Sequence, residues 1–297
     1  MINNVNILVR GSRGRIGTAI CSQIESDMSS FTRIIPTNAY GSLTLYLQNS
    51  SFPTLIILAS GNSVNSSNKS ACKIDTENIV QFLEYIGKAN LAKANDQILF
   101  ISSGGTVYGD SPQQITESTG LNPKTPYAEE KVLQEILIRD WADRRGIRSY
   151  IFRLANVYAV NSLRPKGLIE RAVHSLSAGV SMNITSSYNS RKQYGTSYDY
   201  AKWILSSWRE IQLFPDVSIV NLFAKHSYSI NEVLVEVEEN LSQNFSRFNA
   251  ISDPSKMKTE TVMLDTNYKL AFLKGGWVPL DVALTKSERR CVCAECV

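Results

Sequence analysis

The chain has 297 residues, of which 43% are hydrophobic and 20% are charged, and its formal net charge is +4 at neutral pH. This composition is typical of a globular protein large enough for one α/β domain or two smaller lobes. Lys and Arg are mixed with Asp and Glu along the chain, which argues against a nucleic-acid-binding protein. Apolar runs such as residues 55–59 are far shorter than the roughly 18 residues of a membrane span. We therefore expect a cytoplasmic protein with neither a nucleic-acid nor a membrane partner.

A metal site is not expected from the ligand-forming residues. Cys291, Cys293 and Cys296 crowd the last seven residues, but three thiolates need a fourth ligand to form a structural site. The two histidines, His174 and His226, lie far away in the sequence. We predict that no metal is bound.

The first half of the chain alternates strand-like and helix-like segments. Unbroken apolar, strand-like runs occupy residues 5–9, 32–35, 54–59, 97–102 and 149–154. Helix-like segments follow at Ile16, Ile20 and Ile24, at 77–86 and at 127–145. Apolar strands separated by helices favour a parallel sheet that is covered on both faces. The pattern therefore predicts a doubly wound α/β fold.

Three glycines, Gly11, Gly14 and Gly17, fall between the first expected strand and the first expected helix. Glycines at this spacing permit a tight turn, close approach of the backbone to a diphosphate, and close packing of the helix. The N-terminus of the helix adds N–H donors and a partial positive charge. The segment predicts the dinucleotide-binding loop of a Rossmann domain.

The residues after the second strand bear on the choice between NAD and NADP. Sites that prefer NAD carry an acidic residue roughly 20 positions after the loop, which holds the ribose 2′-hydroxyl. Thr37 and Asn38 stand there instead, and neither is acidic. A 2′-phosphate would not be repelled, and Arg13 or Arg33 could approach it. Both cofactors stay open, with a slight preference for NADP.

The second half of the chain is less regular. We expect helices at 167–179 and 198–208, a polar loop at 186–195 and a strand at 217–223. Ser229 followed by Glu232 has the spacing of a capping box, which would open a helix over 230–241. The resulting prediction is a dinucleotide-binding domain at 1–155, to which 196–225 return. A smaller C-terminal α/β substrate lobe would comprise 156–195 and 226–297.

Tyr127 and Lys131 are separated by four residues, and Pro126 before them favours a helix start. Both side chains would then share one helix face. A phenol titrates near about 10, so it needs a neighbouring ammonium and a cationic nicotinamide ring to act as a base near neutrality. The spacing alone is common and usually structural. Its position after a nucleotide loop, a fourth strand and a Ser-rich turn favours a catalytic pair.

Several motifs now occur in a recognisable order: GSRGRIG (11–17), LIILAS (55–60), ISSGGTVYGD (101–110), PYAEEK (126–131) and RLANVY (153–158). In this the chain resembles the extended short-chain dehydrogenase/reductase family, the NAD-dependent epimerase/dehydratases of nucleotide sugars. The resemblance implies that Tyr127 is the acid/base and that Lys131 binds the nicotinamide ribose and lowers the pKa of the phenol. It implies a homodimer paired through the helices at 77–86 and 127–145. Cofactor contacts are implied at Gly11, Arg13, Gly14, Ile16, Gly17, Thr37, Leu58, Ala59, Ser60, Ser102, Tyr127, Lys131 and Leu154.

One expected hydroxyl is missing. The family's assisting Ser or Thr falls at Gly104 in this chain, with Ser103 before it and Thr106 two residues later. If the segment is extended, residues 104 and 106 lie on the same side, which favours Thr106 as the substitute. Ser103, a bound water, or no such group are the alternatives.

Substrate contacts are also implied by the resemblance. Asn156 would meet the diphosphate of a nucleotide-sugar substrate, and Arg191 or Lys192 would hold the same group. Arginine is favoured because its planar fork can bind two phosphate oxygens. The Gly-Pro that usually follows is replaced by Ala159 and Val160, so the shape of that loop is left open.

The leading hypothesis is a nucleotide-sugar 4-epimerase. Tyr127 would take the proton of the 4-hydroxyl while hydride passes to the cofactor, and hydride would return to the other face of the 4-keto sugar. The alternatives are an NADPH-dependent 4-ketosugar reductase and a non-catalytic sensor or scaffold. Gly105 and Thr106 replace the Asp-Glu pair of the dehydratases, which argues against a 4,6-dehydratase. The nucleotide and the sugar are left open.

Overall fold

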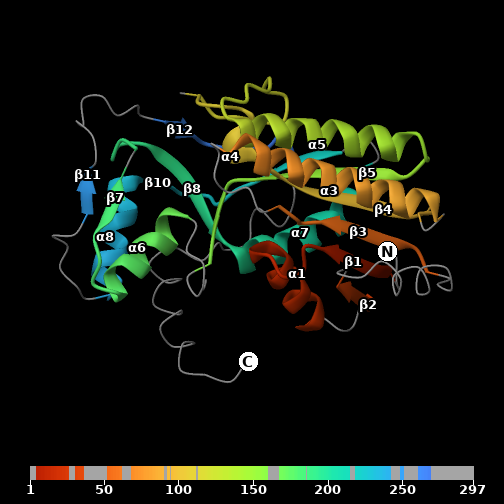
Figure 1. Ribbon diagram of the computed structural model, residues 1–297, viewed down its shortest axis with the longest axis horizontal. Helices are drawn as coiled ribbons and strands as arrows, with labels where there is room; N and C mark the ends of the chain where they lie inside the picture. Colours follow the sequence, from red (N-terminus) through yellow and green to blue (C-terminus); the bar gives the residue numbers. More distant parts are fainter. Residues whose placement is uncertain are drawn as a thin grey trace.

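The computed structural model describes residues 5–26, 31–36, 52–61, 68–89, 92–93, 95–111, 113–159, 167–184, 186–214, 218–241, 248–250 and 260–268. These residues form a six-stranded parallel sheet with helices on both faces and a smaller lobe at one end (Figure 1). The predicted doubly wound α/β fold is confirmed.

The large sheet has the strand order β2-β1-β3-β4-β5-β9, and every neighbouring pair is parallel. Its strands are β1 (Val5–Arg10), β2 (Phe31–Pro36), β3 (Thr54–Leu58), β4 (Gln97–Ser103), β5 (Arg148–Leu154) and β9 (Ile219–Leu222). The order reverses between β1 and β3. A crevice at the carboxyl ends of the strands at such a reversal is where open α/β sheets bind ligands.

Helices cover both faces of this sheet (Figure 1). On one face lie α3 (Lys69–Lys88) and α5 (Pro126–Asp143), whose Phe82 and Trp141 are buried against it. On the other lie α1 (Arg15–Ser26) and α7 (Ser197–Ile211). Helix α5 begins at Pro126 as predicted, and Thr125 caps it by accepting a hydrogen bond from the N–H of Ala128. The pairing of α3 with α5 brings residues of distant segments together above the carboxyl ends of β3 and β4.

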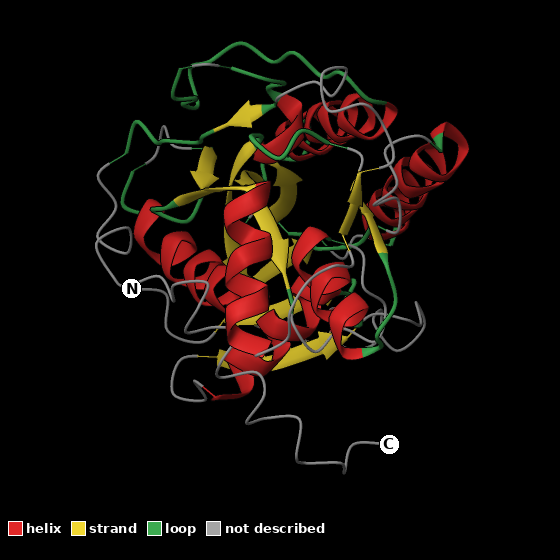
Figure 2. Cartoon of the chain, turned by 90° about the vertical axis from the view of Figure 1, so that its left-hand side faces the viewer, coloured by secondary structure: helices red, strands yellow, loops and turns green. Residues whose placement is uncertain are grey.

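The smaller lobe, which faces the reader in Figure 2, is built around strand β8 (Arg191–Thr196). This strand pairs with β6 (Asn156–Tyr158), β10 (Ser227–Ser229) and β12 (Thr261–Val262). The expectation of a polar loop throughout 186–195 is therefore wrong. The polar sequence of this segment did not indicate a strand, because the strands that pair with it come from three other parts of the chain.

Helices α6 (Leu168–Ser177) and α8 (Ile230–Leu241) pack together in this lobe, beside the short strands β7 (Met182–Ile184) and β11 (Phe248–Ala250). The predicted capping box at the start of α8 is confirmed. The N–H of Glu232 donates to the Ser229 hydroxyl at 3.1 Å, and the N–H of Ser229 donates to the Glu232 carboxylate at 2.7 Å. Across the described ranges, no helix has both the length and the apolar character to cross a membrane.

Candidate active site

The glycine loop joins β1 to α1 at the reversal of strand order. Gly11 has a φ of +90°, and a Cβ there would lie 2.7 Å from the backbone of Ala59 and Ser60. The N–H of Gly14 donates to the Gly11 carbonyl at 2.9 Å, and a Cβ on Gly17 would collide with that carbonyl. The turn therefore needs glycine at Gly11 and Gly17. Gly14 is exposed at the start of α1, so the loop fits a dinucleotide diphosphate lying against the helix N-terminus.

The other residues predicted to contact a cofactor are distributed around this loop. Leu58 is the buried last residue of β3, and Leu154, at the end of β5, is in register with Ser103. Arg13 is exposed on the loop, whereas Ile16 packs partly against the core. Thr37, Asn38 and the side chain of Arg33, on which the choice between NAD and NADP depends, lie outside the described residues.

Tyr127 and Lys131 occupy successive turns at the start of α5. The ammonium of Lys131 lies 5.9 Å from the centre of the Tyr127 ring and 4.6 Å from that of Phe100. It also donates a hydrogen bond to the Ile101 carbonyl at 3.4 Å. Lys131 is buried. These contacts bring Tyr127 and Lys131 together at the carboxyl end of β4, as their spacing in the sequence predicted.

Burial opposes the charged form of both groups. It raises the pKa of Tyr127 to about 12, although a hydrogen bond with the Ser103 side chain acts in the opposite direction. Burial also lowers the pKa of Lys131 to about 8, against the influence of Asp75 and Glu135. A further positive charge near the phenol would favour its deprotonation. The pair is therefore suited to a cationic nicotinamide ring placed beside it.

Asp75, on α3, is a residue that sequence reasoning missed. A Cβ on Gly61 would lie 3.7 Å from the Asp75 carboxylate and 3.9 Å from the Lys131 ammonium. The negative charge of Asp75 raises the pKa of both Tyr127 and Lys131. No local motif could have indicated this, because the proximity depends on how α3 packs against α5.

The segment after β4 is helical, not extended as expected. Residues Gly104–Val107 form the short helix α4, and the Thr106 hydroxyl donates back to the Ser103 carbonyl at 3.4 Å. A Cβ on Gly104 would collide with the Leu264 side chain and lie 3.0 Å from the Arg153 carbonyl. Alternation along an extended segment therefore gives no support to Thr106. The Ser103 side chain, by contrast, lowers the pKa of the Tyr127 phenol.

Ser102 belongs to a buried polar network beneath the site. Its hydroxyl donates to Glu135 at 2.5 Å, and the same carboxylate pairs with Arg153 at 2.6 Å. Arg153 also donates to the Tyr108 hydroxyl at 2.7 Å, which in turn donates to Asn221 at 2.9 Å. The network fixes β4, β5 and β9 relative to α5. It thereby supports the helix that carries Tyr127 and Lys131.

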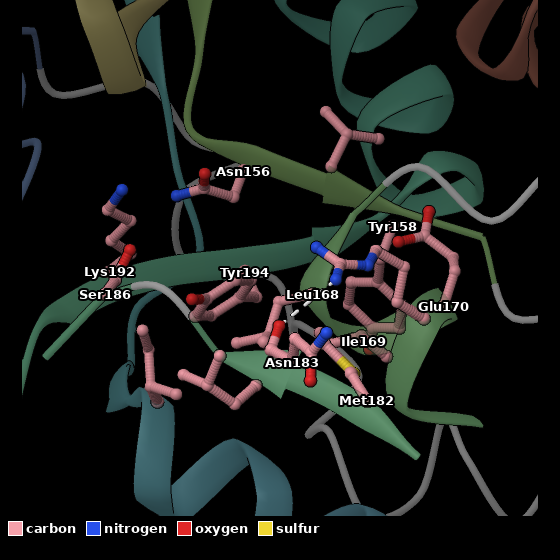
Figure 3. Close-up of a pocket in the computed structure, with 14 residues that line it drawn as sticks. Asn156, Tyr158, Leu168, Ile169, Glu170, Met182, Asn183, Ser186, Lys192 and Tyr194 are labelled. Atoms are coloured by element: carbon pink, nitrogen blue, oxygen red, sulfur yellow. Dashed lines mark hydrogen bonds between the residues drawn. The ribbon is translucent and has the colours of Figure 1, made fainter. Parts of the chain in front are cut away.

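A cavity of about 230 Å³ opens in the smaller lobe (Figure 3). Asn156, Lys192 and Tyr194 line it, and a Cβ on Gly105 of α4 would lie 3.7 Å from the Asn156 amide. The cavity thus begins next to the segment that carries Ser103. Its remaining walls come from β6, α6 and β7, with Ile230 of α8.

Of the two cations proposed to hold a phosphate, Lys192 lines the cavity. Arg191 pairs with Glu232 at 3.1 Å and donates to the Ser227 carbonyl. The ammonium of Lys192 lies 3.1 Å from the Glu260 carboxylate. Successive residues of a strand point to opposite faces, which explains why neighbouring cations differ in this way.

Arg171 and Tyr194 also line the cavity, and sequence reasoning did not single them out. Arg171, on α6, donates to the Asn183 carbonyl at 3.2 Å. Burial raises the pKa of Tyr194, which favours a neutral aromatic side chain in the cavity wall. The alternation along β8 that places Lys192 in the wall also places Tyr194 there, but it becomes usable only once the segment is known to be a strand.

No group of three potential metal ligands occurs within the part of the chain that the structure describes. Cys291, Cys293 and Cys296 lie outside it.

The profile of the NAD dependent epimerase/dehydratase family matches residues 7–222, from the first strand to the end of β9. The chain belongs to this family. The match covers the glycine loop, the Tyr127–Lys131 pair and much of the cavity wall. The family resemblance predicted from the motifs is confirmed.

A curated relative in the family is dTDP-4-dehydro-6-deoxyglucose reductase of Escherichia coli, which is 26% identical over 189 residues. That alignment covers 63% of this chain and 58% of the reductase. Among solved structures, the UDP-glucose 4-epimerase of Thermotoga maritima has a TM-score of 0.75 at 16% identity, covering 97% of this chain and 99% of the epimerase. The UDP-glucose 4-epimerase of Thermus thermophilus has a TM-score of 0.72 at 18% identity, with coverage of 97% and 99%. At these identities the structural likeness shows the shared fold.

Proposed function

We propose that the protein is an NAD(P)-dependent nucleotide-sugar 4-epimerase that acts through a transient 4-keto sugar. The observation that carries the proposal is the pair of partly buried Tyr127 and buried Lys131 at the carboxyl ends of β3 and β4, with the Ser103 side chain lowering the pKa of the phenol. This arrangement lies on the family's nucleotide fold, and a cavity suited to the rest of a substrate begins beside it.

The residues have separable tasks in this proposal. Tyr127 accepts the proton of the sugar 4-hydroxyl and later returns it, and Ser103 holds the phenol and the sugar oxygen by hydrogen bonds. The ammonium of Lys131 stabilises the phenolate and reaches toward the nicotinamide ribose. When bound, the cofactor supplies the hydride acceptor and donor. Release and return of hydride on opposite faces requires that the keto sugar turn between the two steps.

The cavity is proposed to hold the nucleotide diphosphate. Lys192 and Arg171 provide positive charge, Asn156 provides hydrogen bonds, and Tyr194 provides an aromatic surface for the base. Solved neighbours of the same fold were captured with UDP-glucose or with NAD. Since Thr37 and Asn38 place no acid after β2, NADP stays slightly favoured over NAD for this chain.

A second candidate is a 4-ketosugar reductase that consumes NADPH. The sequence likeness to the Escherichia coli reductase favours it, as does the missing acid at Thr37. The same Tyr127 would then donate a proton to the 4-keto oxygen while that carbon is reduced. The two candidates differ in whether the cofactor is regenerated within one turnover.

Cofactor behaviour provides the test. We would release ligands from the purified protein for mass spectrometry, and assay UDP-glucose without added cofactor and dTDP-4-keto-6-deoxyglucose with NADPH. An epimerase retains its cofactor through purification and converts the first substrate, whereas a reductase oxidises NADPH in proportion to product. Tyr127→Phe should retain cofactor binding and lose turnover by roughly 10² or more. A protein that binds neither cofactor and converts neither sugar would contradict both candidates.

A further inference from the structure

Arg15 links the glycine loop to the smaller lobe. It is the first residue of α1, directly after Gly14, but its side chain extends across to residues more than a hundred positions away. One guanidinium nitrogen donates to the Val157 carbonyl at 2.8 Å, and another pairs with the Glu170 carboxylate at 2.7 Å. Val157 and Glu170 both belong to the wall of the cavity, where Figure 3 shows Glu170 on the side opposite Lys192.

The Glu170 carboxylate needs the positive charge of Arg15, because its side chain is only 1% exposed and water cannot solvate it. One carboxylate oxygen accepts hydrogen bonds from Arg15 and from the N–H of Ala159 at 3.1 Å. The other is buried against Gly167 and has no hydrogen-bond partner among the described residues. A buried carboxylate that loses its cation leaves an uncompensated charge, which is strongly unfavourable. Without Arg15, the first turn of α6 would have to rearrange.

We propose that Arg15 is a positioning residue which couples occupancy of the cofactor loop to the shape of the substrate cavity. The inference rests on the proposed function, since it takes the loop to bind a dinucleotide and the cavity to bind a nucleotide sugar. A diphosphate held at the N-terminus of α1 fixes the backbone of Arg15. Its guanidinium then fixes β6 through Val157 and α6 through Glu170. Because coupling between two binding sites is reciprocal, substrate in the cavity strengthens cofactor binding by the same factor.

The charge of Glu170 adds a second consequence. A nucleotide diphosphate is an anion, and an uncompensated carboxylate in the cavity wall would repel it. Arg15 neutralises the charge of Glu170, and it is not one of the residues proposed to transfer a proton. Its loss should therefore raise KM for a nucleotide sugar more than it lowers kcat.

Hydrogen–deuterium exchange of the full chain tests the coupling directly. Exchange would be compared with and without saturating NAD or NADP, using the cofactor that protects the glycine loop itself at 11–17. In the wild-type protein we expect the cofactor to slow exchange also in α6. In Arg15→Met and in Glu170→Gln, the loop should still be protected while protection of α6 is lost. Arg144→Met removes an exposed arginine paired with Asp140 and serves as the matched control, with α6 protected as in the wild type.

The possible outcomes separate this inference from the proposed function. If neither cofactor protects the glycine loop, both fail. If the loop is protected but α6 is not, or if α6 is protected equally in all variants, only the coupling fails. In kinetic assays with UDP-glucose as the probe, Arg15→Met should raise KM by roughly 5- to 50-fold, with kcat within about threefold of the wild type. The double variant Arg15→Met/Glu170→Gln should recover part of that loss, and strictly additive effects would also overturn the proposal.

Discussion

The Ser103 side chain lowers the pKa of the Tyr127 phenol through a hydrogen-bonding interaction, although Ser103 stands one position before the glycine where the family's hydroxyl falls. A side chain at Gly104 would require the Leu264 side chain to shift and would lie tightly against the Arg153 carbonyl, 3.0 Å from the added Cβ. The side chain that acts on the phenol therefore comes from Ser103, one backbone position before Gly104. A hydrogen bond of this kind is valuable in catalysis when it strengthens as charge develops on the oxygen.

Removing this hydroxyl should be costly. We expect Ser103→Ala to lower kcat by about ten- to a thousandfold, a typical range for one hydrogen bond that strengthens in the transition state. Thr106→Val should change kcat little, because the Thr106 hydroxyl is already bonded to the Ser103 carbonyl. Steady-state kinetics of the two variants provide the measurement. A large loss in Thr106→Val with near-normal Ser103→Ala would assign the role to Thr106 instead.

Asp75 should set the pH range of activity. Its charge raises the pKa of both Tyr127 and Lys131, so the isosteric change Asp75→Asn lowers both values. In an epimerase the phenol must first lose its proton, and the acidic limb of the kcat/KM profile should move to lower pH. In a reductase the phenol must carry its proton, and the alkaline limb should move in the same direction. We expect a shift of roughly half a unit or more.

The control for this profile is Asp140→Asn, which makes the same chemical change at an exposed residue of α5 that pairs with Arg144. Its profile should coincide with that of the wild type. Other charged or titratable groups facing the pair are Cys72 and Glu135, and both remain unchanged in each variant. A profile for Asp75→Asn that stays in place or moves to higher pH would show that Asp75 does not act on the reacting groups.

The sequence predicted the features that are encoded within short segments, and it did not predict the contacts that depend on packing between distant segments. Apolar strands, the glycine loop and the spacing of Tyr127 and Lys131 are encoded within short segments, so the fold and the proximity of these two side chains could be predicted. Asp75 could not, since it reaches Lys131 only through the contact of α3 with α5. The pair of Arg15 and Glu170 is separated by more than 150 residues, so no spacing rule joins them. The same limit explains the error at β8, whose pairing partners lie elsewhere in the chain.

Removing one partner of the ion pair between Arg153 and Glu135 should strongly destabilise the fold. Both side chains are almost fully buried, with exposures of 4% and 3%. We expect Arg153→Met to lower the free energy of unfolding by roughly 3–5 kcal/mol, because it leaves the Glu135 charge uncompensated. Arg153→Met/Glu135→Gln should lose less than the single change, as seen by urea denaturation. Equal losses for the two proteins would mean that packing, and not charge, determines the cost.

The outer faces of α3 and α5 should form a dimer interface. These helices lie side by side on one face of the sheet (Figure 1), and they expose Ile74 (55%), Leu133 (42%) and Ile136 (58%) to solvent. Exposed apolar side chains on neighbouring helices are suited to a self-complementary contact between two copies of the chain. We expect light scattering at micromolar concentration to give the mass of a dimer, and Ile136→Glu to give that of a monomer because it would bury a charge in the contact. Leu213→Glu, at an apolar residue that is 77% exposed beyond the end of α7, is the matched control and should stay dimeric. A monomeric wild-type protein would contradict the prediction outright, and a dimer that persists in Ile136→Glu would place the interface on another surface.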